Sequence, residues 1–261
     1  MKKILSFALA ALMTGLLFTG CQSLPKISVS SKADLADLKI GTQDGTTGQS
    51  LCQKEISSNT DNVKGYKSAM DAALALKNGT VDAVVIDELP AKSIVAQNND
   101  LTILDLELSE PEGYAIAVKK GNTELLEQIN ATLKRMKEDG TYDALGEAFI
   151  PSDGEIKVPE DKATEGDGKI IMGTNASFPP FEYLDGTRIV GFDISMSQEI
   201  AADMGKKLEV SNMDFNALLG ALSTGQIDFV AAGMTVEPDR LENADFSDVY
   251  FTSKQVVIVR K

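Results

Sequence analysis

The spacing of apolar residues predicts alternating short strands and amphipathic helices. In residues 122–139 apolar side chains recur every three or four positions. Asn122 or Thr123 can cap the first turn, and Gly140 can end the helix. The apolar face consists of Leu125, Ile129, Leu133 and Met136. A second helical stripe, expected like the first to pack into a core, consists of Phe215, Leu218, Leu219 and Leu222.

Two segments of the chain match each other without a gap. Residues 75–84 have the sequence ALKNGTVDAV and residues 221–230 have ALSTGQIDFV. Each is typical of a last helical turn, a glycine that can adopt the left-handed conformation, and a buried strand with a β-branched start. A short apolar strand ending in Gly-Thr precedes each segment, from about Lys39 and Lys169. Two copies of a strand, loop, helix and strand unit predict two similar α/β lobes.

Residues 151–168 differ in composition from both units. They are rich in Pro, Gly, Asp, Glu and Lys and contain almost no side chains to bury. This composition indicates a linker or an exposed connection. If flexible, the segment would span on the order of 23 Å.

The N-terminus has the features of an export signal. Lys2 and Lys3 precede an apolar stretch over residues 4–18, which is shorter than the roughly 20 residues of a membrane-spanning helix. We therefore expect residues 1–20 to be removed. The following Cys21 resembles the lipidated cysteine of a bacterial lipobox, with Phe18 where leucine is more usual. The alternative is a plain secretory signal, and a lipidated Cys21 would leave Cys52 as a lone thiol.

Charge and composition exclude several classes of function. The formal net charge of -14 becomes -16 once Lys2 and Lys3 are removed, which argues against nucleic acid or anionic lipid headgroups as partners. The chain has no histidine, which excludes a serine-histidine or cysteine-histidine nucleophile and a histidine-based metal site. We expect no cofactor and no metal.

Three polar clusters follow predicted strands, where open α/β sheets gather ligand contacts. The first is TNASFPPFEY at residues 174–183, followed by VGFD at 190–193. The second is AGMTVEPDR at residues 232–240. The third joins DGTTG at residues 44–48 to Asp87.

These clusters give the chain a family resemblance. Residues 171–260 resemble the first half of the polar amino acid substrate-binding proteins of ABC importers. Residues 35–150 resemble the second half, through GTTG, VDAVVID, YAIAVKKGN and DGTYDAL. The resemblance implies an α/β fold of two lobes joined by a hinge, the type II periplasmic-binding-protein fold, in circularly permuted order.

The resemblance also implies domain boundaries. In this order each lobe would be contiguous, with one covalent crossover, and residues 255–259 would lie beside residues 114–118, held by hydrogen bonds alone. The expected segments are the signal 1–20, a tether 21–33, one lobe 34–113, a crossover strand 114–119, helices 120–150 of the other lobe, the linker 151–168, and the remainder with a second crossover strand, 169–261.

An amino acid zwitterion held away from water needs a fixed cation for its carboxylate and a fixed anion for its ammonium. The guanidinium of Arg240 suits the first task, and the resemblance gives Asp87 the second. Alternatively, Arg240 lies exposed on a short helix and Asp87 only caps the helix that begins at Glu88. Further contacts implied by the resemblance are Gly233, Thr235, Thr46 and Thr47, with Phe178 stacking on the ligand and Phe215 as a second aromatic; both rings could instead be core.

The uncharged Asn175 and Gln43 bear on the ligand's side chain. Family members that bind cationic amino acids often carry an acid where Asn175 stands, so we expect a neutral polar ligand such as glutamine. A cationic ligand stays open because other residues can supply the charge.

The function implied by the resemblance is that of an extracytoplasmic, monomeric binding lipoprotein, which is anchored through Cys21, binds a polar amino acid and delivers it to an ABC permease. The main alternative is an enzyme like cyclohexadienyl dehydratase, which shares this fold and needs a positioned acid or base; Glu182 and Lys54 are available. Another alternative is a ligand sensor module.

Overall fold

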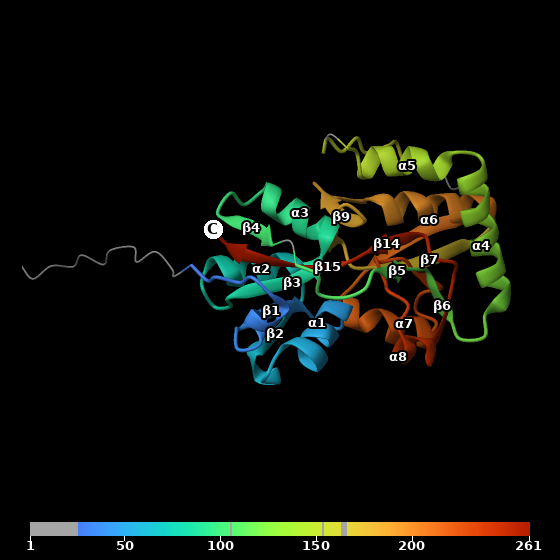
Figure 1. Ribbon diagram of the computed structural model, residues 1–261. Helices are drawn as coiled ribbons and strands as arrows, with labels where there is room; N and C mark the ends of the chain where they lie inside the picture. The colour runs from blue at the N-terminus through green and yellow to red at the C-terminus, as the bar shows by residue number, and fades with distance from the viewer. Residues whose placement is uncertain (1–25, 105, 153, 163–165) are drawn as a thin grey trace, which may run out of the picture.

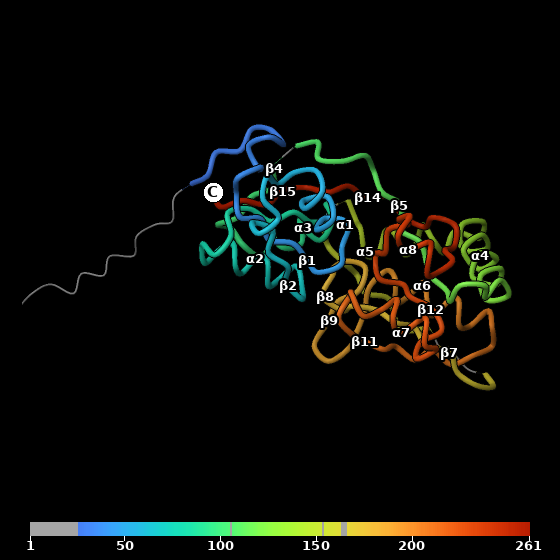
Figure 2. The backbone as a smooth tube through the Cα atoms, turned by 90° about the horizontal axis from the view of Figure 1, so that it is seen from below, coloured from blue at the N-terminus to red at the C-terminus, as the bar shows by residue number. Residues whose placement is uncertain are grey.

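The computed structural model describes residues 26–104, 106–152, 154–162 and 166–261 (Figure 1). The predicted signal and Cys21 lie outside these residues. Within the described parts of the chain, no helix has the length and apolar character needed to cross a membrane. The chain forms two lobes side by side, as Figures 1 and 2 show from two directions.

The first lobe is built on a five-stranded sheet in the order β2-β1-β3-β15-β4. β2 and β3 run parallel to β1, and β15 runs antiparallel to both of its neighbours. The strands are β1 Ile40–Gln43, β2 Val63–Tyr66, β3 Ala83–Asp87, β4 Leu101–Leu104 and β15 Gln255–Arg260. The helices and turns are η1 Lys32–Leu35, α1 Thr47–Leu51, η2 Cys52–Ile56, η3 Thr60–Asn62, α2 Ala69–Lys77 and α3 Glu88–Ala96.

The second lobe has a five-stranded sheet in the order β11-β7-β12-β6-β13 and a small antiparallel sheet in the order β10-β9-β8. The strands are β6 Ala117–Lys119, β7 Lys169–Thr174, β8 Ser177–Phe178, β9 Glu182–Asp185, β10 Arg188–Val190, β11 Lys207–Asn212, β12 Phe229–Val230 and β13 Ala244–Phe246. The helices are α4 Thr123–Glu138, α5 Thr141–Phe149, α6 Phe192–Asp203, η4 Phe215–Ala217, α7 Leu218–Thr224 and α8 Pro238–Leu241.

The repeat found in the sequence occupies the same place in both lobes. β1 and β3 are adjacent and parallel in one sheet, as β7 and β12 are in the other. A Cβ atom on Gly41 would lie 3.2 Å from Val81, and one on Gly173 would lie 2.3 Å from Ile227. Val81 and Ile227 occupy equivalent positions of the repeat. In each lobe, therefore, the absence of a side chain on the glycine leaves space for a β-branched residue at the same position. The predicted organisation in two similar α/β lobes is confirmed.

The predicted helix over residues 122–139 is present as α4. The Asn122 side chain accepts a hydrogen bond from the backbone N–H of Leu125 and so caps it. The buried residues of α4 are Ile129, Thr132, Leu133 and Met136.

The strand expected to form the second crossover lies elsewhere. Residues 255–259 do not lie beside residues 114–118, because β15 is inserted between β3 and β4, with Ile258 opposite Val84 and Ile103. All residues of β15 except Arg260 are buried. A continuously apolar strand must be covered on both faces of a sheet, which a two-stranded hinge does not offer.

The hinge is formed by β5 Glu112–Tyr114 and β14 Phe251–Ser253, which pair antiparallel with Phe251 opposite Tyr114. β6 then belongs to the sheet of the second lobe. The chain therefore crosses between the lobes twice, and the first lobe is assembled from both ends of the chain. The expectations of one covalent crossover and of contiguous lobes are wrong in this respect.

The described part of the 151–168 connection runs along the second lobe. The backbone N–H of Lys157 donates to the carbonyl of Ala148, and that of Lys162 donates to Gln198 Oε1. The Lys162 ammonium lies 2.6 Å from Glu199 Oε2. These contacts tie the segment to α5 and α6 while most of it stays exposed.

Because β15 lies between two other strands of its sheet, we expect its buried side chains to contribute strongly to the free energy of unfolding. Ile258→Ala should lower the free energy of unfolding by about 2 to 5 kcal/mol, because it opens a cavity where Ile258 is fully buried. Urea unfolding of the purified protein measures this change. Leu184→Ala is the control, since Leu184 is 57% exposed and should change stability by less than about 0.5 kcal/mol. Equal effects of the two changes would contradict the buried position of β15.

Candidate functional site

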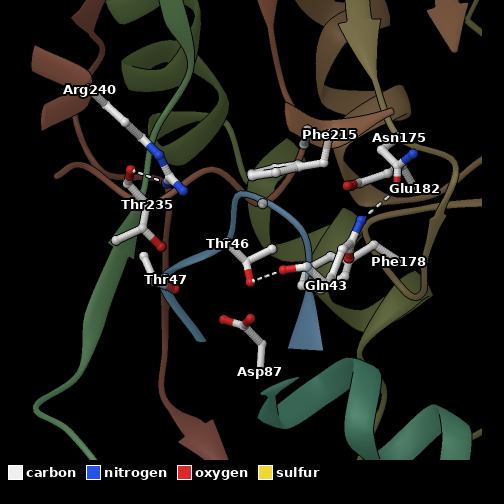
Figure 3. A pocket seen from close by; sticks show the side chains of 12 residues that line it. Gln43, Thr46, Thr47, Asp87, Asn175, Phe178, Glu182, Phe215, Thr235 and Arg240 are labelled. Atoms are coloured by element: carbon white, nitrogen blue, oxygen red, sulfur yellow. Dashed lines mark hydrogen bonds between the residues drawn. The ribbon is translucent and has the colours of Figure 1, made fainter. Parts of the chain in front are cut away.

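A pocket lies between the two lobes (Figure 3). All ten residues that the sequence analysis proposed for ligand contact border it, together with Glu182 and Ala232. The first lobe contributes Gln43, Thr46, Thr47 and Asp87. The second lobe contributes Asn175, Phe178, Glu182, Phe215, Ala232, Gly233, Thr235 and Arg240.

The lobes are closed on each other around this pocket. Gln43 Nε2 in the first lobe donates to Asn175 Oδ1 in the second at 2.9 Å. A Cβ atom on Gly45 would lie 2.9 Å from Asn216 Cβ, so the backbones meet closely here. Ion pairs at the rim also join the lobes: Lys67 with Asp214, and Lys54 with Asp239. Lys54, one of the candidate catalytic groups, is therefore outside the pocket.

Asp87 ends β3 and precedes the first residue of α3, yet its side chain makes no capping bond. It instead accepts a 2.5 Å hydrogen bond from the hydroxyl of Tyr114, a hinge residue. Burial raises the pKa of Asp87 to about 6, helped by nearby Glu112, although hydrogen bonds from Tyr114 and other groups act against this. The carboxyl group is thus held in place. Among the described residues Asp87 forms no ion pair, although Arg240 interacts with it electrostatically.

Arg240 lies in α8 and is only 8% exposed, so the alternative of a surface arginine is wrong. Nη1 donates to the carbonyl of Thr235 at 2.8 Å, and Nη2 donates across the cleft to the carbonyl of Gly45 at 2.9 Å. Glu237 lies 3.1 Å from Nη2, and the guanidinium carbon lies 5.5 Å from the centre of the Phe215 ring. These contacts fix the orientation of the guanidinium at one end of the pocket.

The aromatic wall depends on a glycine. Gly233 has φ +53°, and a Cβ atom there would lie 2.8 Å from Cε1 of Phe178. Phe178 also packs against Phe181, with ring centres 6.0 Å apart, so it belongs to the core as well as to the pocket. Phe215 is half-buried beside Arg240.

The threonines position the loop between β1 and α1. Thr46 Oγ1 donates to the carbonyl of Gln43 and accepts from the backbone N–H of Gln49, which caps α1. Thr47 Oγ1 accepts a hydrogen bond from Gln255 Nε2 at 3.2 Å. Across the cleft, the hydroxyl of Thr235 donates to Glu112 Oε2 at 2.9 Å.

Glu182, a candidate catalytic acid or base in the sequence, also lines the pocket, which the sequence pattern does not predict. Figure 3 shows it with Asn175 at the end opposite Arg240. Burial, followed by the nearby Asp193, raises the pKa of Glu182 well above its ordinary value. Glu182 and Asp193 therefore form a pair of neighbouring acids. The sequence signal for this pair is that PFEY, which contains Glu182, and GFD, which contains Asp193, lie close together in the chain.

The site therefore offers a cation at one end, an acid from the opposite lobe, and a second acid at the far end. Among the described residues, no group of three His, Cys, Asp or Glu side chains is placed to hold a metal ion.

The chain belongs to the bacterial extracellular solute-binding proteins, family 3, whose model matches residues 53–152 and 170–261. This confirms the family resemblance and the two-lobed type II fold. It is 46% identical over 96 residues to the arginine-binding extracellular protein ArtP of Bacillus subtilis (strain 168), covering 37% of this chain and 38% of that protein. It is 34% identical over 94 residues to the ABC transporter arginine-binding protein 1 of Escherichia coli (strain K12), covering 36% of this chain and 39% of that protein. The chain thus spans about two fifths of the length of these relatives.

Among solved structures, the chain is similar to the arginine-bound form of domain 1 from TmArgBP. The identity is 37% and the TM-score 0.32, over 36% of this chain and 81% of that chain. It is also similar to an ancestral arginine-binding protein bound to glutamine, at 46% identity and a TM-score of 0.32, over 32% of this chain and 38% of that chain.

The raised pKa of Asp87 predicts a pH-dependent cost in stability. Between pH 3.8, its ordinary pKa, and about pH 6, the folded protein binds more protons than the unfolded chain, so the unfolding free energy falls as pH rises. Asp87→Asn removes this loss, and the ligand-free variant should gain about 2 kcal/mol over the wild type between pH 4 and pH 7.

Urea unfolding at both pH values measures the gain. Asp185→Asn, at an exposed position in β9, is the matched control and should follow the wild type at both pH values. A wild type and an Asp87→Asn variant that keep the same stability difference at pH 4 and pH 7 would contradict the shifted pKa.

Proposed function

We propose that this chain binds a polar L-α-amino acid in the pocket between its lobes and delivers it to the permease of an ABC importer. The observation that carries the proposal is the pair of buried, opposite charges, Arg240 and Asp87, on facing lobes of one closed pocket. An α-amino acid brings a carboxylate and an ammonium that match them. Closure of the lobes then follows from binding, because each lobe supplies one of the two charges.

The walls of the pocket support a small ligand. Phe178 and Phe215 offer aromatic faces to the stem of the ligand's side chain. Such a lining suits a single amino acid better than a peptide.

For the ligand's side chain, we favour a cationic amino acid such as arginine over the neutral ligand that Asn175 and Gln43 suggested. The side-chain amides of Gln43 and Asn175 are hydrogen-bonded to each other across the cleft, so they join the two lobes at the pocket. Glu182 supplies the acid that the sequence pattern lacked at Asn175. The names of the arginine-binding relatives support the same choice.

A binding function is favoured over catalysis by the positions of the candidate acid and base. Lys54 is 68% exposed and does not border the pocket, so of the two candidate groups only Glu182 lies where a ligand would bind. Product analysis after incubation with amino acids and cyclic acids tests this choice.

We also propose that the segment order is circularly permuted and that Cys21 carries the lipid anchor of an extracytoplasmic monomer. The family model matches on both sides of residues 153–169 but not across them. The C-terminus and the first described residues lie together at the far end of the first lobe (Figures 1 and 2). New chain ends at one exposed place are what a tolerated permutation requires.

Removal of Arg240 tests the binding proposal directly. Arg240→Ala should weaken arginine binding by roughly 3 to 5 kcal/mol, about a hundredfold or more in Kd, because the ligand's carboxylate would be buried without a cation. Titration calorimetry measures the change. Arg188→Ala is the matched control, because Arg188 is exposed and pairs with Asp161 away from the pocket. Unchanged affinity in Arg240→Ala would remove the basis of the proposal.

Substitution of Cys21 tests the anchor. Cys21→Ser should move the protein from the membrane fraction to the soluble fraction, because the lipid chains supply the membrane affinity. Cys52→Ser is the control, since Cys52 is buried in the first lobe and should leave the distribution unchanged. A wild type found unlipidated in the soluble fraction would refute the anchor.

A further inference from the structure

We infer that Glu182 and Asp193 share one proton in the empty pocket and release it when a cationic side chain enters. The binding of a cationic ligand is then coupled to proton release, whereas the binding of a neutral ligand is not. This inference rests on the proposed amino acid binding. It makes Asp193, which does not border the pocket, a positioning residue for ligand selection.

Hydrogen bonds to described residues other than Glu182 engage only one of the two oxygens of the Asp193 carboxyl group. Oδ2 accepts from the backbone N–H of Gly233 at 2.9 Å and from the hydroxyl of Tyr250 at 2.7 Å. Oδ1 of Asp193 and both oxygens of Glu182 are buried and have no partner among the described residues outside this pair. Two adjacent carboxyl groups satisfy each other only when one carries a proton and donates it to the other.

Among the described residues, the groups that interact with the pair are acids and phenols, and none is a cation. Asp87 faces Glu182 from the first lobe, and Tyr250 and Tyr142 face Asp193. Arg240 interacts with Glu237, Glu112 and Asp87 instead, at the other end of the pocket. Burial raises the pKa of Asp193 to about 6 and that of Glu182 well above its ordinary value. At neutral pH one proton therefore remains on the pair, on Glu182, and Asp193 accepts it.

A guanidinium at the far end of the pocket would supply the missing cation. An opposite charge in contact lowers the pKa of a carboxyl group, and in a closed cleft little water screens the effect. Glu182 would then lose its proton to solvent and accept hydrogen bonds from the guanidinium. A neutral side chain with a carbonyl group would leave the proton in place and accept a hydrogen bond from it.

This mechanism links affinity to pH with a defined sign. Protons compete with the cation for Glu182, so arginine binding should weaken by up to about tenfold for each pH unit below the pKa of the pair. Citrulline has nearly the shape of arginine but a neutral side chain, so it escapes this competition. Asp87 titrates near pH 6 and meets the same α-ammonium in both ligands, so the difference between arginine and citrulline isolates the pair.

The experiment is titration calorimetry of the full chain with arginine and citrulline at pH 7, in two buffers with different ionisation enthalpies. The dependence of the observed heat on the buffer gives the protons released per ligand. Arginine should release about one proton more than citrulline. Equal release by the two ligands would overturn the inference while leaving amino acid binding intact.

Three variants separate the pair from its surroundings. In Asp193→Asn the amide oxygen can still accept from Gly233 and Tyr250, and the amide nitrogen donates to an ionised Glu182. This variant should lose the extra proton release and bind arginine more tightly than the wild type. Glu182→Gln should lose both the proton release and the preference for arginine. Asp203→Asn is the matched control on the same helix, because Asp203 pairs with Arg135 away from the pocket, and it should behave as the wild type.

The remaining outcomes are also decisive. Undiminished proton release in a folded Glu182→Gln variant would assign the proton to another group and overturn the inference. Binding of glutamine without any binding of arginine would overturn it as well, because the pair would then exclude a cation. Failure of every amino acid to bind would instead refute the proposed function, on which the inference rests.

Discussion

The burial of charged groups in the closed cleft is the constraint on which the site depends. Arg240 and Asp87 face the pocket from different lobes, and no ion pair joins them among the contacts of the described residues. Asp87, Glu182 and Asp193 are all buried, and burial raises the pKa of each. A buried charge without a partner is costly, so the closed pocket favours a ligand that carries the complementary charges.

The hinge is connected to this site through the hydroxyl group of Tyr114, among other contacts. Tyr114 ends β5, pairs with Phe251 of β14, and donates its phenolic hydrogen to Asp87. Its ring packs edge-on against Phe181, with centres 5.3 Å apart, in the aromatic cluster behind the pocket. A ligand ammonium that binds Asp87 therefore contacts a group that is already bonded to the hinge. The two strands that join the lobes and the acid that binds the ligand form one connected unit.

The path of the chain connects both lobes to this unit. Both crossings between the lobes are covalent, through β5 and β14, and β15 then completes the sheet of the first lobe. The sheet of the first lobe therefore combines β1 to β4 with a strand that follows the second lobe in the chain. The hydrogen bonds from the 151–168 connection to α5 and α6 lie outside the pocket and the hinge.

Local patterns in the sequence predicted the repeated α/β units and α4 with its cap, and the family resemblance supplied the ten residues that border the pocket. These features depend on neighbours in the chain or on strand ends, where the spacing of apolar and polar residues carries the information. The partners of β15 and the contact between Glu182 and Asp193 were not predictable in this way. The apolar side chains of Val256 and Ile258 would fit the interior of either sheet. Which strands flank them depends on packing between segments about 170 residues apart in the chain. Glu182 gains its chemical character only where folding buries it beside a second acid, because desolvation and the proximity of Asp193 set its pKa.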